Sequence, residues 1–138
     1  MKAWLLDTGA LVAYLNARDR EHSAVAAALD AYRGRLVTSS AVITEAMHLL
    51  AAAANGPVLL AAFVAESGLE VYDLCQPADL ADAAALMAKY ADTPMDFADA
   101  TLLLLAEHLS LRELATLDRR GFTVYRTRQG KALKLVLG

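Results

Sequence analysis

The chain has 138 residues, of which 57% are hydrophobic and 21% charged. This length and composition predict a single folded domain, residues 1–138, with its own core, and they exclude a disordered chain. The net charge of −3 is unevenly distributed, because residues 1–111 hold 6 basic and 14 acidic side chains whereas residues 112–138 hold 7 and 2. A basic tail on an acidic body suits a partner with a phosphate backbone, and equally a solvated surface.

The cysteine content and the apolar segments indicate a cytoplasmic protein that does not enter the membrane. The single cysteine, Cys75, cannot form an internal disulfide, and the apolar run before it predicts a buried, inert thiol. The apolar start of the chain is interrupted by Asp7, too early for a secretory signal. Residues 46–65 carry no formal charge, but the Asn-Gly-Pro sequence at 55–57 favours two buried helices joined by a turn over a membrane span.

The first half of the chain alternates apolar strands with helices. Gly34 and Gly68 are suitable helix stops, and Ser39 and Ser40 are suitable N-caps for a following helix. The expected elements, in chain order, are a strand at 3–6, a helix from the turn at 8–9 to residue 15, a helix at about 22–33, a strand at 36–38, a helix at about 41–54 and a helix from the 55–57 break to about 67.

The second half repeats this alternation. It predicts a strand at 69–74, a helix at about 78–91, a helix at about 96–109, a strand at 114–117 and a strand at 123–126. Alternating strands and helices predict an α/β fold with a parallel sheet covered on both faces, a three-layer α/β/α sandwich. The last link, 118–122, is too short for a normal helical crossover, so spacing alone leaves a hairpin equally possible there.

Four acidic residues are expected to meet at one edge of this sheet. Asp7 and Asp118 close the first and fourth strands, and Asp99 lies in the first turn of the helix that leads into the fourth strand. Glu45 lies near the second turn of the helix that follows the second strand. In a parallel α/β sheet the carboxyl ends of the strands and the starts of the crossover helices share an edge, where ligand sites lie.

Clustered carboxylates imply a specific chemistry. Two unit charges about 4 Å apart repel by about 4 kcal/mol at an effective dielectric constant of 20. Such a cluster therefore holds either a proton or a cation, and oxygen ligands favour Mg²⁺ or Mn²⁺. These ions activate water and stabilise leaving oxygens in phosphodiester hydrolysis. The structural alternative is that each acid only caps a helix or starts a turn, and Asp96, just before a helix, fits a capping role best.

Four segments together resemble the motifs of the PIN-domain family, in order and over nearly the whole chain. They are Leu-Leu-Asp-Thr-Gly-Ala-Leu at 5–11, Ser-Ser-Ala-Val-Ile-Thr-Glu at 39–45, Met-Asp-Phe-Ala-Asp-Ala at 95–100 and Ala-Thr-Leu-Asp-Arg-Arg-Gly-Phe at 115–122. The resemblance implies a five-stranded, mainly parallel sheet and a Mg²⁺- or Mn²⁺-dependent endoribonuclease. The short chain looks like the VapC-type toxins of toxin–antitoxin systems, which are usually dimers held inactive by a cognate antitoxin.

The resemblance also assigns roles to individual residues. It implies that the metal-binding and catalytic residues are Asp7, Glu45, Asp99 and Asp118. Thr8 would orient a carboxylate or a water molecule, and Asp96 sits where many relatives have a polar residue, so it is expected to cap a helix rather than bind metal. Four arginines close to Asp118 could contact the RNA backbone or could face solvent, namely Arg119, Arg120, Arg126 and Arg128. The apolar residues 46–65 could form a dimer or antitoxin contact, or part of the core.

Two other functions compete with the nuclease. A catalytically inactive PIN-like module that only binds RNA or protein is disfavoured because all four acids are present. A phospho-acceptor domain of flavodoxin-like fold is disfavoured because Asp118 stands where such domains need a lysine. Glu45 and His48 have the i, i+3 spacing of di-iron bundles, but no second pair exists, so His48 is expected to be structural.

Overall fold

A computed structural model describes residues 2–137, and within them a five-stranded sheet is flanked by seven helices. All pairings between strands are parallel, and the strand order is β3-β2-β1-β4-β5. The elements are β1 (Ala3–Leu6), α1 (Thr8–Leu15), α2 (His22–Ala31), β2 (Arg35–Ser39), α3 (Ser40–Leu50), α4 (Gly56–Ser67), β3 (Glu70–Tyr72), α5 (Pro77–Lys89), α6 (Phe97–Leu109), β4 (Glu113–Ala115), α7 (Arg119–Phe122) and β5 (Lys134–Leu135).

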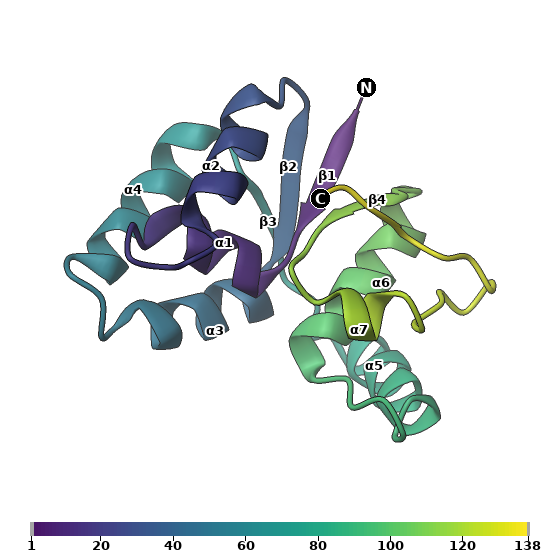
Figure 1. Ribbon diagram of the computed structural model, residues 1–138. Helices are drawn as coiled ribbons and strands as arrows, with labels where there is room; N and C mark the ends of the chain where they lie inside the picture. Colours follow the sequence, from purple (N-terminus) through teal and green to yellow (C-terminus); the bar gives the residue numbers. More distant parts are fainter. Residues whose placement is uncertain (1, 138) are drawn as a thin grey trace.

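The helices form the two outer layers of the expected three-layer sandwich. Helices α1 to α4 lie on one side of the sheet, and α5, α6 and α7 lie on the other (Figure 1). Because both faces are covered, the central strands are continuous apolar runs, and Leu5, Leu6 and Leu114 are fully buried. Helix α6 is buried on all sides from Ala100 to Ala106, which explains its unbroken apolar sequence.

Polar side chains start the helices at the carboxyl edge of the sheet. Asp7 caps α1, Asp96 caps α6 and Asp118 caps α7, and each accepts a hydrogen bond from a backbone N–H of its own helix. Ser39 caps α3 by accepting from Val42 N–H at 3.2 Å. Capping therefore holds three acidic side chains at the edge where the candidate site was expected.

The fifth strand lies elsewhere than predicted. Residues 123–126 are not a strand, because the N–H groups of Thr123, Val124 and Tyr125 bond to carbonyls of the short helix α7 and cannot join a sheet. The actual β5 pairs with β4 in parallel, Glu113 opposite Lys134, so the hairpin alternative is wrong and the parallel arrangement is confirmed. The chain between β4 and β5 is long enough for a parallel crossover once the strand is moved to 134–135.

Two apolar segments remain to be placed, the run before Cys75 and residues 46–65. Cys75 is exposed, so the prediction of a buried thiol was wrong. The preceding run is an edge strand of three residues, and Val71 within it is 40% exposed. Within residues 46–65, α3 ends at Leu50, four residues before its predicted end, and α4 begins at Gly56, in the predicted break. Across residues 2–137, no helix has both the length and the apolar character needed to cross a membrane.

Candidate active site at the carboxyl edge of the sheet

The candidate site lies where the strand order reverses. From β1 the chain builds outward to β2 and β3 on one side, and later adds β4 and β5 on the other. Asp7 directly follows β1, and Asp118 follows β4, the neighbour of β1 in the sheet. The beginnings of α1 and α7 consequently lie near each other at the carboxyl ends of the strands, which point downward in Figure 1. Ligands of open α/β sheets bind at such a switch point.

Asp7 is the most deeply buried acid of the site, with only 6% of its surface exposed. Its two oxygens accept hydrogen bonds from Thr8 N–H at 2.8 Å and from the Thr116 hydroxyl at 2.6 Å. Burial raises the pKa of Asp7 to about 6, the charges of Asp118 and Asp96 add to the rise, and the two hydrogen bonds oppose it. This carboxyl group is therefore held in a fixed position in surroundings that disfavour its negative charge.

Asp96 and Asp99 form a capping box at the start of α6. Asp96 Oδ1 accepts from Asp99 N–H at 2.8 Å, and Asp99 Oδ2 accepts from Asp96 N–H at 3.1 Å. Burial raises the pKa of Asp99 to about 8, and the charges of Asp96 and Asp7 contribute. The predicted capping role of Asp96 is confirmed, but its charge also acts on Asp7, Glu45 and Asp99, which places it within the acidic cluster.

Glu45 and Asp118 complete the cluster from two further helices. Glu45 is half-buried on α3, and burial together with Asp96 raises its pKa, whereas the nearby Thr8 hydroxyl lowers it. Thr8 Oγ1 is buried and forms no hydrogen bond of ordinary geometry with another described residue. Asp118 is exposed and accepts from Gly121 N–H at 3.0 Å. Gly121 has no room for a side chain, because a Cβ atom would lie 2.6 Å from Asp118 Oδ2 and 2.8 Å from the buried ring of Tyr125.

The donor set fits a hard divalent cation. Among residues 2–137, none of the ion pairs involves Asp7, Glu45, Asp96, Asp99 or Asp118. The mutual repulsion of these acids is therefore not offset by a lysine or arginine, and all their ligating atoms are oxygens. In the described part of the chain, no three His, Cys, Asp or Glu side chains surround a common point as they stand. The site thus has the charge and the oxygen donors that suit such an ion.

Two residues that the sequence analysis did not identify support the acids. The Thr116 hydroxyl donates to Asp7 Oδ2 and accepts from Asp118 N–H at 2.9 Å, so it links the two strand-end acids. Tyr125 is 1% exposed and donates to the carbonyls of Thr93 and Pro94, at 3.0 and 2.6 Å. It thereby fixes the loop before α6. Burial and the surrounding acids raise the pKa of Tyr125 to about 12, which keeps its hydroxyl protonated.

The arginines after Asp118 divide into two groups. Arg126 donates to the carbonyls of residues 123–125, and Arg128 pairs with Asp82 at 2.9 Å and with Glu107 at 3.0 Å. These contacts fix the segment that follows α7. Arg119 donates to Leu137 O at 2.9 Å, and Arg120 is exposed beside Asp118. Among the described residues, Arg120 is the one arginine of the four whose side chain forms no hydrogen bond or ion pair.

Comparisons with known proteins agree with this architecture. The PIN domain family model matches residues 4–127. Ribonuclease VapC26 of Mycobacterium tuberculosis is 34% identical over 124 residues, which cover 88% of this chain and 91% of that protein. The crystal structure of Mycobacterium tuberculosis VapC20, a Sarcin-Ricin loop cleaving toxin, has a TM-score of 0.76 and 19% identity over 86% of this chain and 91% of that one. Rickettsia felis VapBC2 bound to promoter DNA has a TM-score of 0.63 and 16% identity over 98% of each chain.

Proposed function

This chain belongs to the PIN-domain family and is a homologue of the VapC ribonucleases, and on that premise we propose that it is a Mg²⁺- or Mn²⁺-dependent endoribonuclease. The observation that supports this most is the acidic cluster at the switch point of the sheet, whose acids form no ion pair with a lysine or arginine among residues 2–137. In such a site Asp7, Glu45, Asp99 and Asp118 hold the cation. A bound ion lowers the pKa of the attacking water and stabilises the leaving oxygen of the phosphodiester.

The remaining residues position the acids and the substrate. Thr116 fixes the Asp7 carboxyl group through its 2.6 Å hydrogen bond, and Thr8 presents its hydroxyl to Glu45 or to a water molecule. Arg119 and Arg120 follow Asp118 directly and contact the RNA backbone next to the scissile phosphate. Arg126 was also predicted to contact the RNA backbone, but its guanidinium group donates instead to the protein carbonyls that follow α7.

Cleavage of total cellular RNA by the purified chain tests the proposal. We expect discrete fragments when Mg²⁺ or Mn²⁺ is present and intact RNA when EDTA is added, because the cation activates the water. RNA that stays intact with the folded, cation-loaded and antitoxin-free protein would instead favour the inactive, RNA- or protein-binding alternative.

Thr116→Val is expected to lower the cleavage rate by about 10–100-fold, the usual effect of removing a partner that orients a metal ligand. Valine keeps the shape of threonine but removes the hydroxyl that bridges Asp7 and Asp118. The Mg²⁺ concentration that gives half of the maximal cleavage rate should be higher than for the original protein. Thr123→Val is the matched control, since the Thr123 hydroxyl is exposed and bonds only Arg120 O. Equal rates for the two variants would contradict the positioning role.

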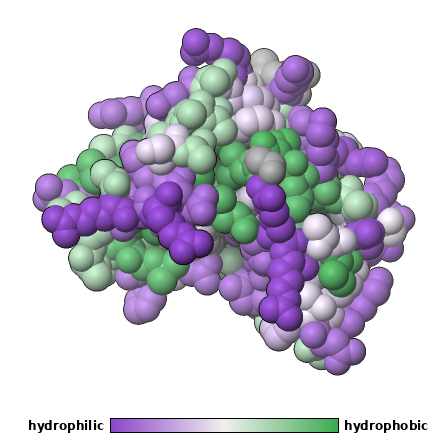
Figure 2. Space-filling model, viewed as in Figure 1, coloured by the Kyte–Doolittle hydropathy of each residue, from purple (hydrophilic) through white to green (hydrophobic). Residues whose placement is uncertain are grey.

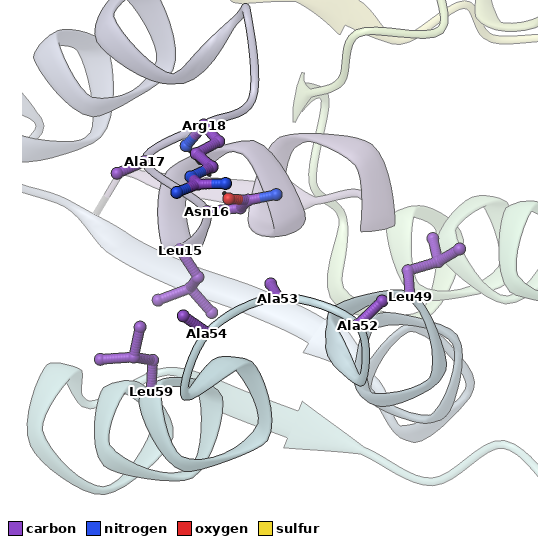
Figure 3. Close-up of a pocket in the computed structure, with 9 residues that line it drawn as sticks. All are labelled: Leu15, Asn16, Ala17, Arg18, Leu49, Ala52, Ala53, Ala54 and Leu59. Atoms are coloured by element: carbon purple, nitrogen blue, oxygen red, sulfur yellow. Dashed lines mark hydrogen bonds between the residues drawn. The ribbon is translucent and has the colours of Figure 1, made fainter.

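We further propose that the chain is the toxin of a type II toxin–antitoxin pair in the cytoplasm and that its antitoxin covers the apolar surface of α3 and α4. Leu49, Val58 and Leu59 are 52, 68 and 43% exposed. Figure 2 shows hydrophobic side chains over these helices on either side of the charged α1–α2 loop. A hollow of about 670 Å³ opens there, and Leu15 and Leu59 point toward each other in it (Figure 3). Burial of such a patch by a partner stabilises a complex.

Leu59→Asp is expected to weaken antitoxin binding about tenfold or more, because it places a charge in an apolar contact. Cleavage of RNA should be unchanged and should no longer be inhibited by equimolar antitoxin. Val124→Asp is the control, since Val124 is 46% exposed but lies after α7, away from this surface. Inhibition that survives in Leu59→Asp would place the antitoxin elsewhere. The expected homodimer is tested separately by the mass of the free chain in solution.

A further inference from the structure

A groove of about 520 Å³ runs beside the acidic cluster, between α3 and the start of α6. Glu45 and Asp96 line both the groove and the cluster, so the two are continuous. Helix α3 also contributes three side chains spaced one helical turn apart, Ser40, Thr44 and His48. Phe97 and Ala98 at the start of α6, together with Cys75 before α5, complete the lining. This volume lies within the roughly 300–1,000 Å³ range of small-molecule sites.

The lining of the groove does not suit a phosphate. No lysine or arginine lines it, and its two carboxylates repel an anion. Its apolar lining includes a half-buried aromatic ring, Phe97. Its polar lining includes the Thr44 hydroxyl, which donates to Ser40 O at 3.0 Å, and the imidazole of His48, which is exposed and bonds no described residue. A lining that combines an aromatic ring with hydrogen-bonding groups is suited to a flat, neutral, polar-edged group.

We propose that this groove binds an unpaired nucleobase of the RNA substrate, next to the phosphate that is cleaved. The proposal rests on the ribonuclease function, because Glu45, which lines the groove, is also one of the residues proposed to hold the cation that acts on that phosphate. Phe97 provides the surface on which the base packs, and Thr44 and His48 bond to its polar edge. The groove thereby makes His48 a substrate contact rather than a structural residue. A base inside a duplex cannot enter it without leaving its stack.

The single cysteine makes the groove accessible to chemical blocking in the native chain. Cys75 is exposed and lines the groove, so a bulky maleimide on its sulfur should occupy the base site. We expect alkylation to weaken binding of a short RNA about tenfold, by loss of one packed base. Binding is measured by fluorescence anisotropy with the Asp7→Asn protein, which keeps the RNA intact. The same RNA should in turn slow the alkylation of Cys75.

Two controls separate blocking of the groove from labelling alone. Cys75→Ser exposed to the same reagent should bind RNA normally. Cys75→Ser/Ser67→Cys carries the label at the exposed end of α4, outside the groove, and should also bind normally. Thr44→Phe, at an exposed helical position, fills the groove without chemistry and should weaken binding about as much as the label does.

An RNA that lacks one base next to the mapped cleavage site identifies what the groove holds. Removing that base should weaken binding to the unmodified protein about tenfold and have little effect on the alkylated protein, since the base has already lost its site. Equal losses in both proteins, or normal binding by the alkylated protein, would overturn the proposal while leaving the nuclease intact. An unmodified protein that neither binds nor cuts RNA with Mg²⁺ would overturn the proposed function itself.

Discussion

Asp7→Asn is expected to lower RNA cleavage by about 10³-fold or more, because a cation contributes several kcal/mol of transition-state stabilisation and this residue is the most buried of the proposed ligands. Asparagine has nearly the same shape and can still accept from Thr8 N–H, so the fold should persist. It offers only one oxygen and no negative charge to the ion. Single-turnover cleavage of a defined RNA at saturating Mg²⁺ measures the change in the chemical step.

The fold of the Asp7→Asn variant is itself informative. Because burial disfavours the charge of Asp7, removal of that charge should stabilise the cation-free protein at neutral pH even as activity is lost. Glu66→Gln is the matched control, since Glu66 is exposed near the end of α4, outside the acidic cluster. A cleavage rate in Asp7→Asn within tenfold of the original would show that the cation is held by other residues, or that a contaminating nuclease is responsible.

The position of the acids could be predicted because it follows from topology. Asp7 and Asp118 end neighbouring parallel strands, and a strand end is visible in the sequence as the point where an apolar run meets a polar residue. Thr116 could not be identified in this way, because its role depends on a bridge across β1 and β4 between residues 109 positions apart. Tyr125 was hidden for another reason, since its apolar surroundings predicted a strand that does not form.

Capping and charge clustering were treated as alternatives for Asp96, yet the structure combines them. The capping bonds of Asp96 and Asp99 join the side chain of each to the backbone of the other at the start of α6. The same arrangement keeps both carboxyl groups at the edge of the sheet that Asp7 faces. Helix capping is thus the local cause that positions Asp99 in the candidate site. A sequence reading that asks only whether an acid is structural or functional misses this double use.

The short strand β5 shows a different limit of sequence reasoning. It has only two residues, but it lies within the mainly apolar run at 132–137, in which Leu133 and Leu137 are buried and which the sequence analysis did not assign to a strand. Its place in the sheet is set by backbone bonds to β4, Lys134 N–H to Arg112 O and Val136 N–H to Leu114 O, at 2.7 and 3.0 Å. The side-chain pattern therefore did not show that this segment, and not residues 123–126, pairs with β4.

Without divalent cations, the stability of the chain is expected to fall as pH rises from about 5 to 8. The pKa values of Asp7 and Asp99 in the folded protein are about 6 and about 8, well above the value of about 3.9 in an unfolded chain. Between pH 4 and 8 the folded state therefore retains protons that the unfolded state has lost, so the free energy of unfolding decreases with pH. Both groups are protonated in both states below this window, where their contribution is complete.

A divalent cation should reverse this trend, because it binds the ionised carboxylates of the folded state and so stabilises that state most at high pH. Thermal unfolding in EDTA should give a melting temperature roughly 5–10 °C lower at pH 8 than at pH 5, and Mg²⁺ should recover most of the difference. Asp99→Asn should remove most of the decrease between pH 6 and 8, where Asp99 is the group that still keeps its proton in the folded state, and leave the part below pH 6 that belongs to Asp7. A melting temperature that rises over the same range in EDTA, or a variant with an unchanged slope, would mean that these carboxyl groups are not held together as the structure has them.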